Sequence, residues 1–238
     1  MKITLIGYGK MGKVIENIAL ERGHTIVHKI DSSNLTQLQQ INTENTDVVI
    51  EFTQPESAIK NILSCFDKKI PVVCGTTGWL NEWENIKKIC EEKNGTLFYA
   101  SNFSVGVNIF FHLNKKLAQI MNNFSNYAIH LEEIHHKEKK DAPSGTAITL
   151  AEGILNENTK KIKWVKDKTS LENELAIVSL REENVPGTHS IFYDSSEDTI
   201  EIKHTAHSRK GFAMGAVIAA EFSKDKKGIL SMQDLLAF

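Results

Sequence analysis

Two histidines and two lysines lie close together in the chain, at His135, His136, Lys139 and Lys140. An imidazole gains or loses its proton near neutral pH and an ammonium group attracts carboxylates, so these residue types suit proton transfer to an anionic substrate. The motif Pro143-Ser144-Gly145-Thr146 follows and opens a helical pattern. A helix N-terminus binds anions through its free N–H groups, and Gly145 would let the backbone approach a ligand. The alternative is a solvated basic loop with two surface histidines.

A strand and a helix are expected to position this stretch. Before it, apolar or aromatic residues alternate roughly with polar ones, at Tyr127, Ile129, Leu131 and Ile134. After it, apolar residues recur at the spacing of one helix face, at Ile148, Leu150, Ala151, Ile154 and Leu155. Asp141 or Ser144 is the candidate N-cap of that helix. We therefore expect the two histidines and two lysines on a loop between the strand end and the helix start.

A second motif with chemical meaning stands at the start of the chain. The apolar run Lys2–Ile6 leads into a G-x-G-x-x-G sequence at 7–12 and then into a helical pattern. A second strand pattern, at 25–30, ends at Asp31, about 20 residues after the last glycine. This order of strand, glycine turn, helix, strand and acid is the dinucleotide-binding fingerprint. The alternative is a glycine turn in another α/β fold. The predicted cofactor-binding residues here are Gly7, Gly9, Lys10, Met11, Gly12 and Asp31.

Asp31 bears on which nicotinamide nucleotide is used. An acid at this position binds the ribose hydroxyls of the adenosine and disfavours a 2′-phosphate. Ser32 and Ser33 follow it, so no arginine stands beside it to receive that phosphate, and Lys29 is the nearest cation. The sequence therefore favours NADH over NADPH and leaves dual use open.

Three further loops follow expected strands and are candidates for contact with the cofactor. In a doubly wound sheet, the loops at the carboxyl ends of the strands face the ligand crevice. Each loop could instead be a plain turn, because Gly, Thr and Asn are common turn residues. Arg209 is also placed with the cofactor site; its guanidinium would clamp a carboxylate, or it is a surface cation. The loop candidates are Phe52, Gly75, Thr76, Thr77, Ala100, Ser101, Asn102 and Phe103.

The order of the elements predicts two domains. Up to Ala100, strand and helix patterns alternate, which predicts an α/β fold with a Rossmann-type doubly wound parallel sheet. A helix over 105–121 and the histidine stretch come next, followed by a polar stretch at 156–174. Strand patterns then occupy 175–180, 189–193 and 199–205, which predicts a second, mixed α+β domain. A helix starting near Ser208 and a short amphipathic tail complete the pattern.

Composition narrows the class of protein. The 238 residues carry a net charge of −2 and are 41% hydrophobic, which gives no support for nucleic-acid or membrane binding. The first residues predict a buried strand rather than a signal peptide, and no apolar run reaches the roughly 18 residues of a membrane span. Cys65, Cys74 and Cys90 lack the spacing of metal ligands. We expect reduced thiols, no bound metal and a cytoplasmic location.

The chain resembles the 4-hydroxy-tetrahydrodipicolinate reductases, also called dihydrodipicolinate reductases. The resemblance is carried by Glu133-Ile134-His135-His136, Lys139 and residues 141–147, which form the highly specific pattern E-x-H-H-x-x-K-x-D-x-P-S-G-T-A. Other similar stretches follow in order along most of the chain, at 9–12, 52–53, 75–78, 102–108, 209 and 212–216.

The resemblance implies an activity and roles for individual residues. The enzyme would reduce 4-hydroxy-tetrahydrodipicolinate with NADH or NADPH, with loss of water, in the diaminopimelate route to lysine. His135 would be the general acid, and Lys139 the cation that binds substrate and assists proton transfer. His136, Gly145 and Thr146 would bind a carboxylate of the small dicarboxylate substrate.

The resemblance also implies how the chain is divided and assembled. A dinucleotide-binding domain would comprise 1–102 and 211–238, and a substrate-binding and tetramerisation domain would comprise 103–210. Hinges would lie near Phe103 and Arg209, and four copies would assemble through the sheet of the second domain.

The sequence departs from the family pattern at two positions, and two alternative functions stay open. Ile6 stands where the family often has glycine, and Lys10 stands where it often has arginine, so the planar fork that suits a phosphate is lost. One alternative is another NAD(P)-dependent enzyme acting on an amino acid, such as an aspartate dehydrogenase. The other is a non-catalytic NAD(H)-sensing protein. Neither would need the H-H-x-x-K stretch joined to P-S-G-T.

Overall fold

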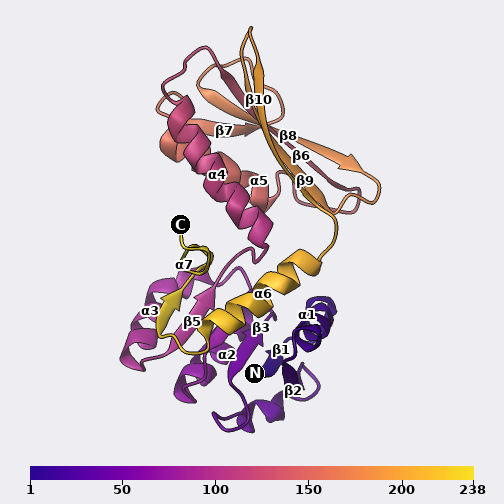
Figure 1. The fold of residues 1–238 in the computed structure, drawn as a ribbon, viewed down its shortest axis with the longest axis vertical. Helices are drawn as coiled ribbons and strands as arrows, with labels where there is room; N and C mark the ends of the chain where they lie inside the picture. The colour runs from indigo at the N-terminus through magenta and orange to yellow at the C-terminus, as the bar shows by residue number, and fades with distance from the viewer. The chain divides into compact units, whose positions relative to one another are not determined.

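The computed structural model describes residues 1–238 and contains two compact units (Figure 1). The first unit combines Met1–Val105 with Arg209–Phe238, and the second is the continuous segment Gly106–Ser208. The boundaries predicted from the sequence lie a few residues from these. The roles expected of the two domains remain predictions.

A six-stranded parallel sheet organises the first unit, with strand order β11-β5-β4-β3-β1-β2. From β1 the chain passes to β2 on one side and then to β3 on the other, so the order reverses between β1 and β3. In such a sheet the ligand crevice lies outside the carboxyl ends of the strands at this reversal. The predicted doubly wound α/β fold is therefore confirmed. The strands are β1 (Lys2–Ile6), β2 (Thr25–Ile30), β3 (Val48–Glu51), β4 (Val72–Cys74), β5 (Thr96–Tyr99) and β11 (Gly228–Leu230).

Helices cover both faces of this sheet, which is why its strands are almost continuously apolar (Figure 1). On one face, α1 (Lys10–Glu21) and α6 (Lys210–Ser223) bury a cluster that includes Leu5 and Ile50. On the other, α2 (Pro55–Asp67) and α3 (Trp83–Glu92) bury a cluster around Phe66 and Trp79. The remaining elements are two 3₁₀ turns, Leu35–Gln39 and Leu80–Glu82, and α7 (Met232–Leu236).

The second unit is a five-stranded mixed sheet with order β10-β9-β6-β8-β7, covered on one face by two helices. The central strand β6 runs antiparallel to β9 and parallel to β8. Residues of β6 at Ile129, Leu131, Glu133 and His135 share the helix-covered face, because side chains alternate along a strand. The elements are α4 (Val105–Met121), β6 (Ala128–His136), α5 (Gly145–Glu157), β7 (Lys163–Lys166), β8 (Glu174–Glu182), β9 (Gly187–Asp194) and β10 (Thr199–Ala206).

Three elements differ from the sequence predictions. The prediction that His135 and His136 lie on a loop is wrong, because β6 continues through both of them, paired with Arg181 and Glu182 of β8. Strand β7 forms inside the polar stretch at 156–174, and β11 forms in the tail by pairing with β5 at the edge of the sheet.

None of the helices combines the length and the apolar character that a membrane crossing requires.

Candidate functional site

The glycine turn between β1 and α1 has the shape of a phosphate cradle. Gly7 has φ +96°, and a Cβ added to it would lie 1.9 Å from the carbonyl oxygen of Phe52. A Cβ on Gly12 would lie 2.4 Å from the carbonyl oxygen of Gly7, whereas one on Gly9 would have no atom within 4 Å. The first N–H groups of α1, starting at Lys10, have no acceptor inside the helix. Open space therefore lies in front of unpaired donors, as a pyrophosphate needs.

Asp31 follows β2 and presents a fixed, ionised carboxylate. Its Oδ1 accepts hydrogen bonds from the Ser33 hydroxyl at 2.6 Å and the Ser33 N–H at 2.8 Å, which lower the pKa of the carboxyl. Lys29 is engaged elsewhere: its Nζ lies 2.8 Å from Glu16 Oε1 and 5.1 Å from the ring centre of Tyr8. The nearest cation is thus already paired with a carboxylate.

A buried glutamate organises the loops that follow β3 and β4. Glu51, at the end of β3, is fully buried and accepts hydrogen bonds from the hydroxyls of Thr53 and Thr76, the latter at 2.7 Å. The Thr76 hydroxyl in turn accepts the Thr53 N–H at 2.7 Å. A Cβ on Gly75 would lie 2.2 Å from the ring of Phe52. The predicted residues Phe52, Gly75 and Thr76 therefore lie together, whereas Thr77 is exposed beside them.

The loop after β5 adjoins the same group. The ring of Phe103 lies 5.6 Å from that of Phe52, and the Ala100 N–H donates to the carbonyl of Cys74 at 3.4 Å. The Asn102 side chain accepts the N–H of Ser104 at 2.9 Å and so shapes the turn. Arg209, by contrast, is exposed at the N-cap of α6, and its guanidinium forms no ion pair. Loops 52–53, 75–77 and 100–103 are thus brought together, while Arg209 is not linked to them.

In the second unit, Ser144 and Glu133 join the end of β6 to the start of α5. The Ser144 hydroxyl accepts the Ala147 N–H at 3.2 Å, so Ser144, rather than Asp141, is the N-cap. The Ser144 N–H is shared between the two carboxylate oxygens of Glu133, at 3.0 and 3.1 Å. Gly145 and Thr146 follow with their N–H groups at the open end of the helix. Such an end attracts anions.

Glu133 is a fully buried carboxylate surrounded by donors. It accepts the Ser179 hydroxyl at 2.7 Å, and the Nε2 atom of His189 lies 3.6 Å away. Burial alone would raise the pKa of Glu133, but the nearby His189 ring and the hydrogen bonds from Ser144 and Ser179 lower it to about 2. The carboxylate is therefore ionised throughout the neutral range.

His135 lies beside this carboxylate and is only 6% exposed. Burial and the neighbouring His189 lower its pKa to about 4, with Lys139 and Arg181 adding to the effect against the attraction of Glu133. Its Nδ1 lies 3.4 Å from Glu133 Oε2 but is not aligned for a hydrogen bond. The imidazole is therefore neutral at pH 7.

Lys139 lies on the loop between β6 and α5, as predicted. Its Nζ lies 2.8 Å from both carboxylate oxygens of Asp141, and its N–H donates to the carbonyl of His136. Arg181 of β8 fixes the loop by donating to the carbonyls of Lys139 and Asp141, at 3.4 and 2.6 Å. The positive charge of Lys139 helps to lower the pKa of His135. The two predicted catalytic residues therefore lie near each other.

The sequence prediction missed four residues of these sites. Glu51, Glu133, Arg181 and His189 hold loops or histidines in place, but none received a role. One signal was available for Glu133, because it falls in the same alternation phase as Ile129 and Leu131 and therefore points inward. A charged residue at an inward position is seldom buried without a partner.

Glu133, His135 and His189 also lie close enough to share a metal ion. The Glu133 carboxylate already accepts hydrogen bonds from Ser144 and Ser179, and we therefore assign it to hydrogen bonding.

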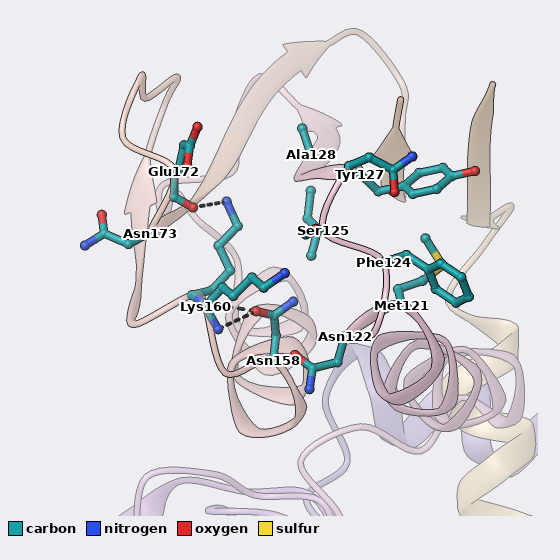
Figure 2. A pocket seen from close by; sticks show the side chains of 13 residues that line it. Met121, Asn122, Phe124, Ser125, Tyr127, Ala128, Asn158, Lys160, Glu172 and Asn173 are labelled. Atoms are coloured by element: carbon teal, nitrogen blue, oxygen red, sulfur yellow. Dashed lines mark hydrogen bonds between the residues drawn. The ribbon is translucent and has the colours of Figure 1, made fainter. Parts of the chain in front are cut away.

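A cavity of about 570 Å³ lies at the other end of the second unit (Figure 2). It is lined by the segment joining α4 to β6 and by residues around 158–161 and 172–173. One wall is fixed by Lys161, which donates to the carbonyl of Glu172 at 2.8 Å. Ala128, the first residue of β6, borders this cavity, whereas His135 is seven residues along the strand, roughly 23 Å away at the usual strand rise. The cavity is therefore not the site that contains His135.

Comparisons with known proteins agree with the motifs. The model for the N-terminus of dihydrodipicolinate reductase matches residues 1–103, and the model for its C-terminus matches 106–236. The chain belongs to the dihydrodipicolinate reductase family. The resemblance seen in the sequence is thus confirmed.

Named relatives span the whole chain. A 4-hydroxy-tetrahydrodipicolinate reductase of Christiangramia forsetii is 52% identical over 237 residues, which cover 100% of this chain and 98% of that protein. Another from Rickettsia bellii is 38% identical and covers 95% of this chain and 90% of its own length. Among solved structures, a dipicolinate-bound dihydrodipicolinate reductase from Paenisporosarcina sp. TG-14 shares the fold with a TM-score of 0.77, at 21% identity and 98% coverage of both chains.

Proposed function

We propose that this dihydrodipicolinate reductase family member reduces 4-hydroxy-tetrahydrodipicolinate to tetrahydrodipicolinate and water, in the diaminopimelate route to lysine. NADH or NADPH supplies the hydride when bound, and the protein supplies a proton. The structural observation that carries the proposal is His135, buried at the end of β6 near the open N-terminus of α5. Full-length relatives at 52% and 38% identity, named for this activity, support it.

The first unit fits a dinucleotide. Gly9 leaves the space in front of the α1 N-terminus open, and Gly7 brings the turn against Phe52. Lys10, Met11 and Gly12 would bind the pyrophosphate, and Asp31 would bind the ribose hydroxyls. NADH is the preferred nucleotide in this proposal, because Asp31 is ionised and Lys29 is paired with Glu16.

The second unit fits a small dicarboxylate. The N–H groups of Gly145 and Thr146 and the side chain of His136 would bind one carboxylate, and Lys139 would approach the other part of the ring. Lys139 is paired with Asp141, so the substrate would compete for its ammonium group. Arg181 keeps the loop that carries Lys139 in place.

The low pKa of His135 would couple protonation of this residue to the binding of substrate. A single carboxylate about 5 Å from the imidazole, at an effective dielectric constant of about 20, favours the charged form by about 3 kcal/mol, or roughly 2 pKa units. Arrival of the dianionic substrate would therefore raise the pKa from about 4 to above 6. His135 would then carry the proton that it gives to the reduced ring.

Two finer features belong to the same proposal. The face of the second unit's sheet opposite α4 and α5 carries Leu180, which is 41% exposed, and the stacked rings of His130 and Phe192. This partly apolar face supports assembly of four copies through the sheet. The three free cysteines support a reducing, cytoplasmic location.

The decisive experiment follows NADH absorbance while the preceding enzyme makes the substrate in place from pyruvate and aspartate semialdehyde. Oxidation should depend on both precursors, and His135→Gln should lower kcat by about 10²–10⁴-fold while NADH still binds. His207→Gln, which removes an exposed histidine of the same unit, is the matched control. If NADH binds to the wild-type protein but is never consumed, a sensing role replaces this proposal. Oxidation driven by an amino acid would favour an amino-acid dehydrogenase instead.

A further inference from the structure

We propose that Glu133 is a positioning residue for the proton donor: it holds His135 with its ring proton on Nδ1, so that Nε2 is the nitrogen that takes up and delivers the proton. The inference rests on the proposed function only in naming His135 as the donor. The orientation itself follows from the geometry of the residues around the ring.

The carboxylate of Glu133 cannot turn away from the histidine. It lies two residues before His135 on the same face of β6 and is fully buried. The Ser144 N–H from the start of α5 and the Ser179 hydroxyl from β8 hold it from two other elements, at 3.0 and 2.7 Å. Its Oε2 is thereby fixed 3.4 Å from Nδ1 of His135.

The neighbours of Nδ1 decide the tautomer. Nδ1 is buried and has no hydrogen-bond partner, so its electrostatic surroundings select the tautomer. The carboxylate of Glu133 lies 3.4 Å away and is an acceptor with no proton to give at neutral pH. A bare lone pair on Nδ1 would face that negative charge, whereas an N–H would be attracted to it. The neutral ring therefore carries its proton on Nδ1, and the lone pair lies on Nε2.

Gly187 keeps space beside the working nitrogen. A Cβ at this position of β9 would lie 3.1 Å from Nε2 and 3.3 Å from Cδ2 of His135. Any side chain there would crowd the edge of the imidazole that must accept and release a proton. The backbone of β9 thus complements the role of Glu133 on the other side of the ring.

Charge makes Glu133 the one favourable partner of a protonated His135. The charged and titratable groups that act on the ring come from every element around it: Lys139 on the loop, Arg181 on β8, His189 on β9 and Glu133 on β6. Lys139, Arg181 and His189 disfavour the imidazolium, and Glu133 alone favours it. Without the charge of Glu133, the substrate would have to raise the proton affinity of His135 unaided.

The first test compares Glu133→Gln with Ser179→Ala. Glutamine keeps the size and an oxygen for the Ser144 N–H but removes the charge, whereas Ser179→Ala removes one hydrogen bond and leaves the charge. For Glu133→Gln, we expect kcat to fall about 30-fold with a KM change below about threefold. Because activity needs protonated His135, the alkaline limb of the kcat–pH profile should move to lower pH by about one unit. Ser179→Ala should move it much less.

The second test needs no turnover and no variant. The ¹⁵N NMR shifts of the His135 ring in the wild-type protein at pH 7 should report the Nδ1–H tautomer. An Nε2–H tautomer, or an unmoved pH profile in folded Glu133→Gln, overturns the inference. These outcomes are distinct from failure of the proposed function, which would appear as a wild-type enzyme that does not consume NADH or as full turnover by His135→Gln.

Discussion

Burial of a neutral histidine should make the protein lose stability as the pH falls from 7 to 5, and His135→Gln should remove part of that loss. The unfolded chain binds a proton at His135 below pH 6.5, whereas the folded chain does not bind it until about pH 4. A group of this kind favours the unfolded state progressively as the pH falls between those two values. The free energy of unfolding therefore decreases as the pH falls through this range.

The expected size follows from the two pKa values. Between pH 7 and pH 5, a pKa of 6.5 in the unfolded chain and about 4 in the folded chain costs about 2 kcal/mol of unfolding free energy. Glu133 contributes little between pH 7 and pH 5. Its pKa is lowered to about 2, so the stability that it contributes is lost only as the pH falls below about 4.5. Lys139, Arg181 and His189 remain in both proteins, so their effects largely cancel in the comparison.

The assay is urea unfolding followed by circular dichroism at pH 7 and pH 5, at one protein concentration, for wild type and His135→Gln. The quantity compared is the change in unfolding free energy between the two pH values, so a constant effect of the substitution drops out. His207→Gln, which removes an exposed imidazole from the same unit, serves as the control. If wild type and His135→Gln lose the same free energy within about 0.5 kcal/mol, His135 is not held neutral by burial and the argument fails.

Three further predictions follow from the first unit and from assembly. Gly7→Ala should lower the free energy of unfolding by about 2 kcal/mol or more, because its Cβ would meet the Phe52 carbonyl. Gly9→Val should leave stability intact but abolish the NADH binding measured by fluorescence titration. Equal effects of the two substitutions would refute the proposed phosphate cradle. Asp31→Ser should lower the NADH-to-NADPH ratio of kcat/KM at least about tenfold, since the acid repels a 2′-phosphate, and an unchanged ratio would remove Asp31 from cofactor choice. Light scattering should give about 107 kDa, four times the chain mass of 26.7 kDa, and a monomer mass would refute assembly through the sheet.

Local pattern predicted much of the fold. The bounds of β1, β2 and α4 agree with the sequence expectation, because each is a clear periodic run between strong boundary signals. The helix cap is also a local signal, although the sequence offered both Asp141 and Ser144 and the structure has Ser144. Such features depend on residues a few positions apart, and a single sequence contains them.

What the sequence did not predict depends on distant partners. The extension of β6 through His135 requires Arg181, and β11 exists as a strand because β5 offers its edge. The role of Glu133 depends on Ser144 and Ser179, donors from two other elements. A motif could place His135 near an active centre, but only packing explains why its imidazole is neutral.

The order in which the chain is synthesised has a consequence for the first unit. Segment 106–208 is continuous and leaves the ribosome before Arg209–Phe238, which supplies α6 and β11 to the first unit. Until then, one face of the nucleotide-binding sheet, including Val73 and Phe98, lacks α6, one of the two helices that cover it. The nascent chain must therefore carry an exposed apolar surface while the second unit is being made. A stalled or truncated product would keep its glycine fingerprint yet be a natural client for chaperones that bind apolar segments.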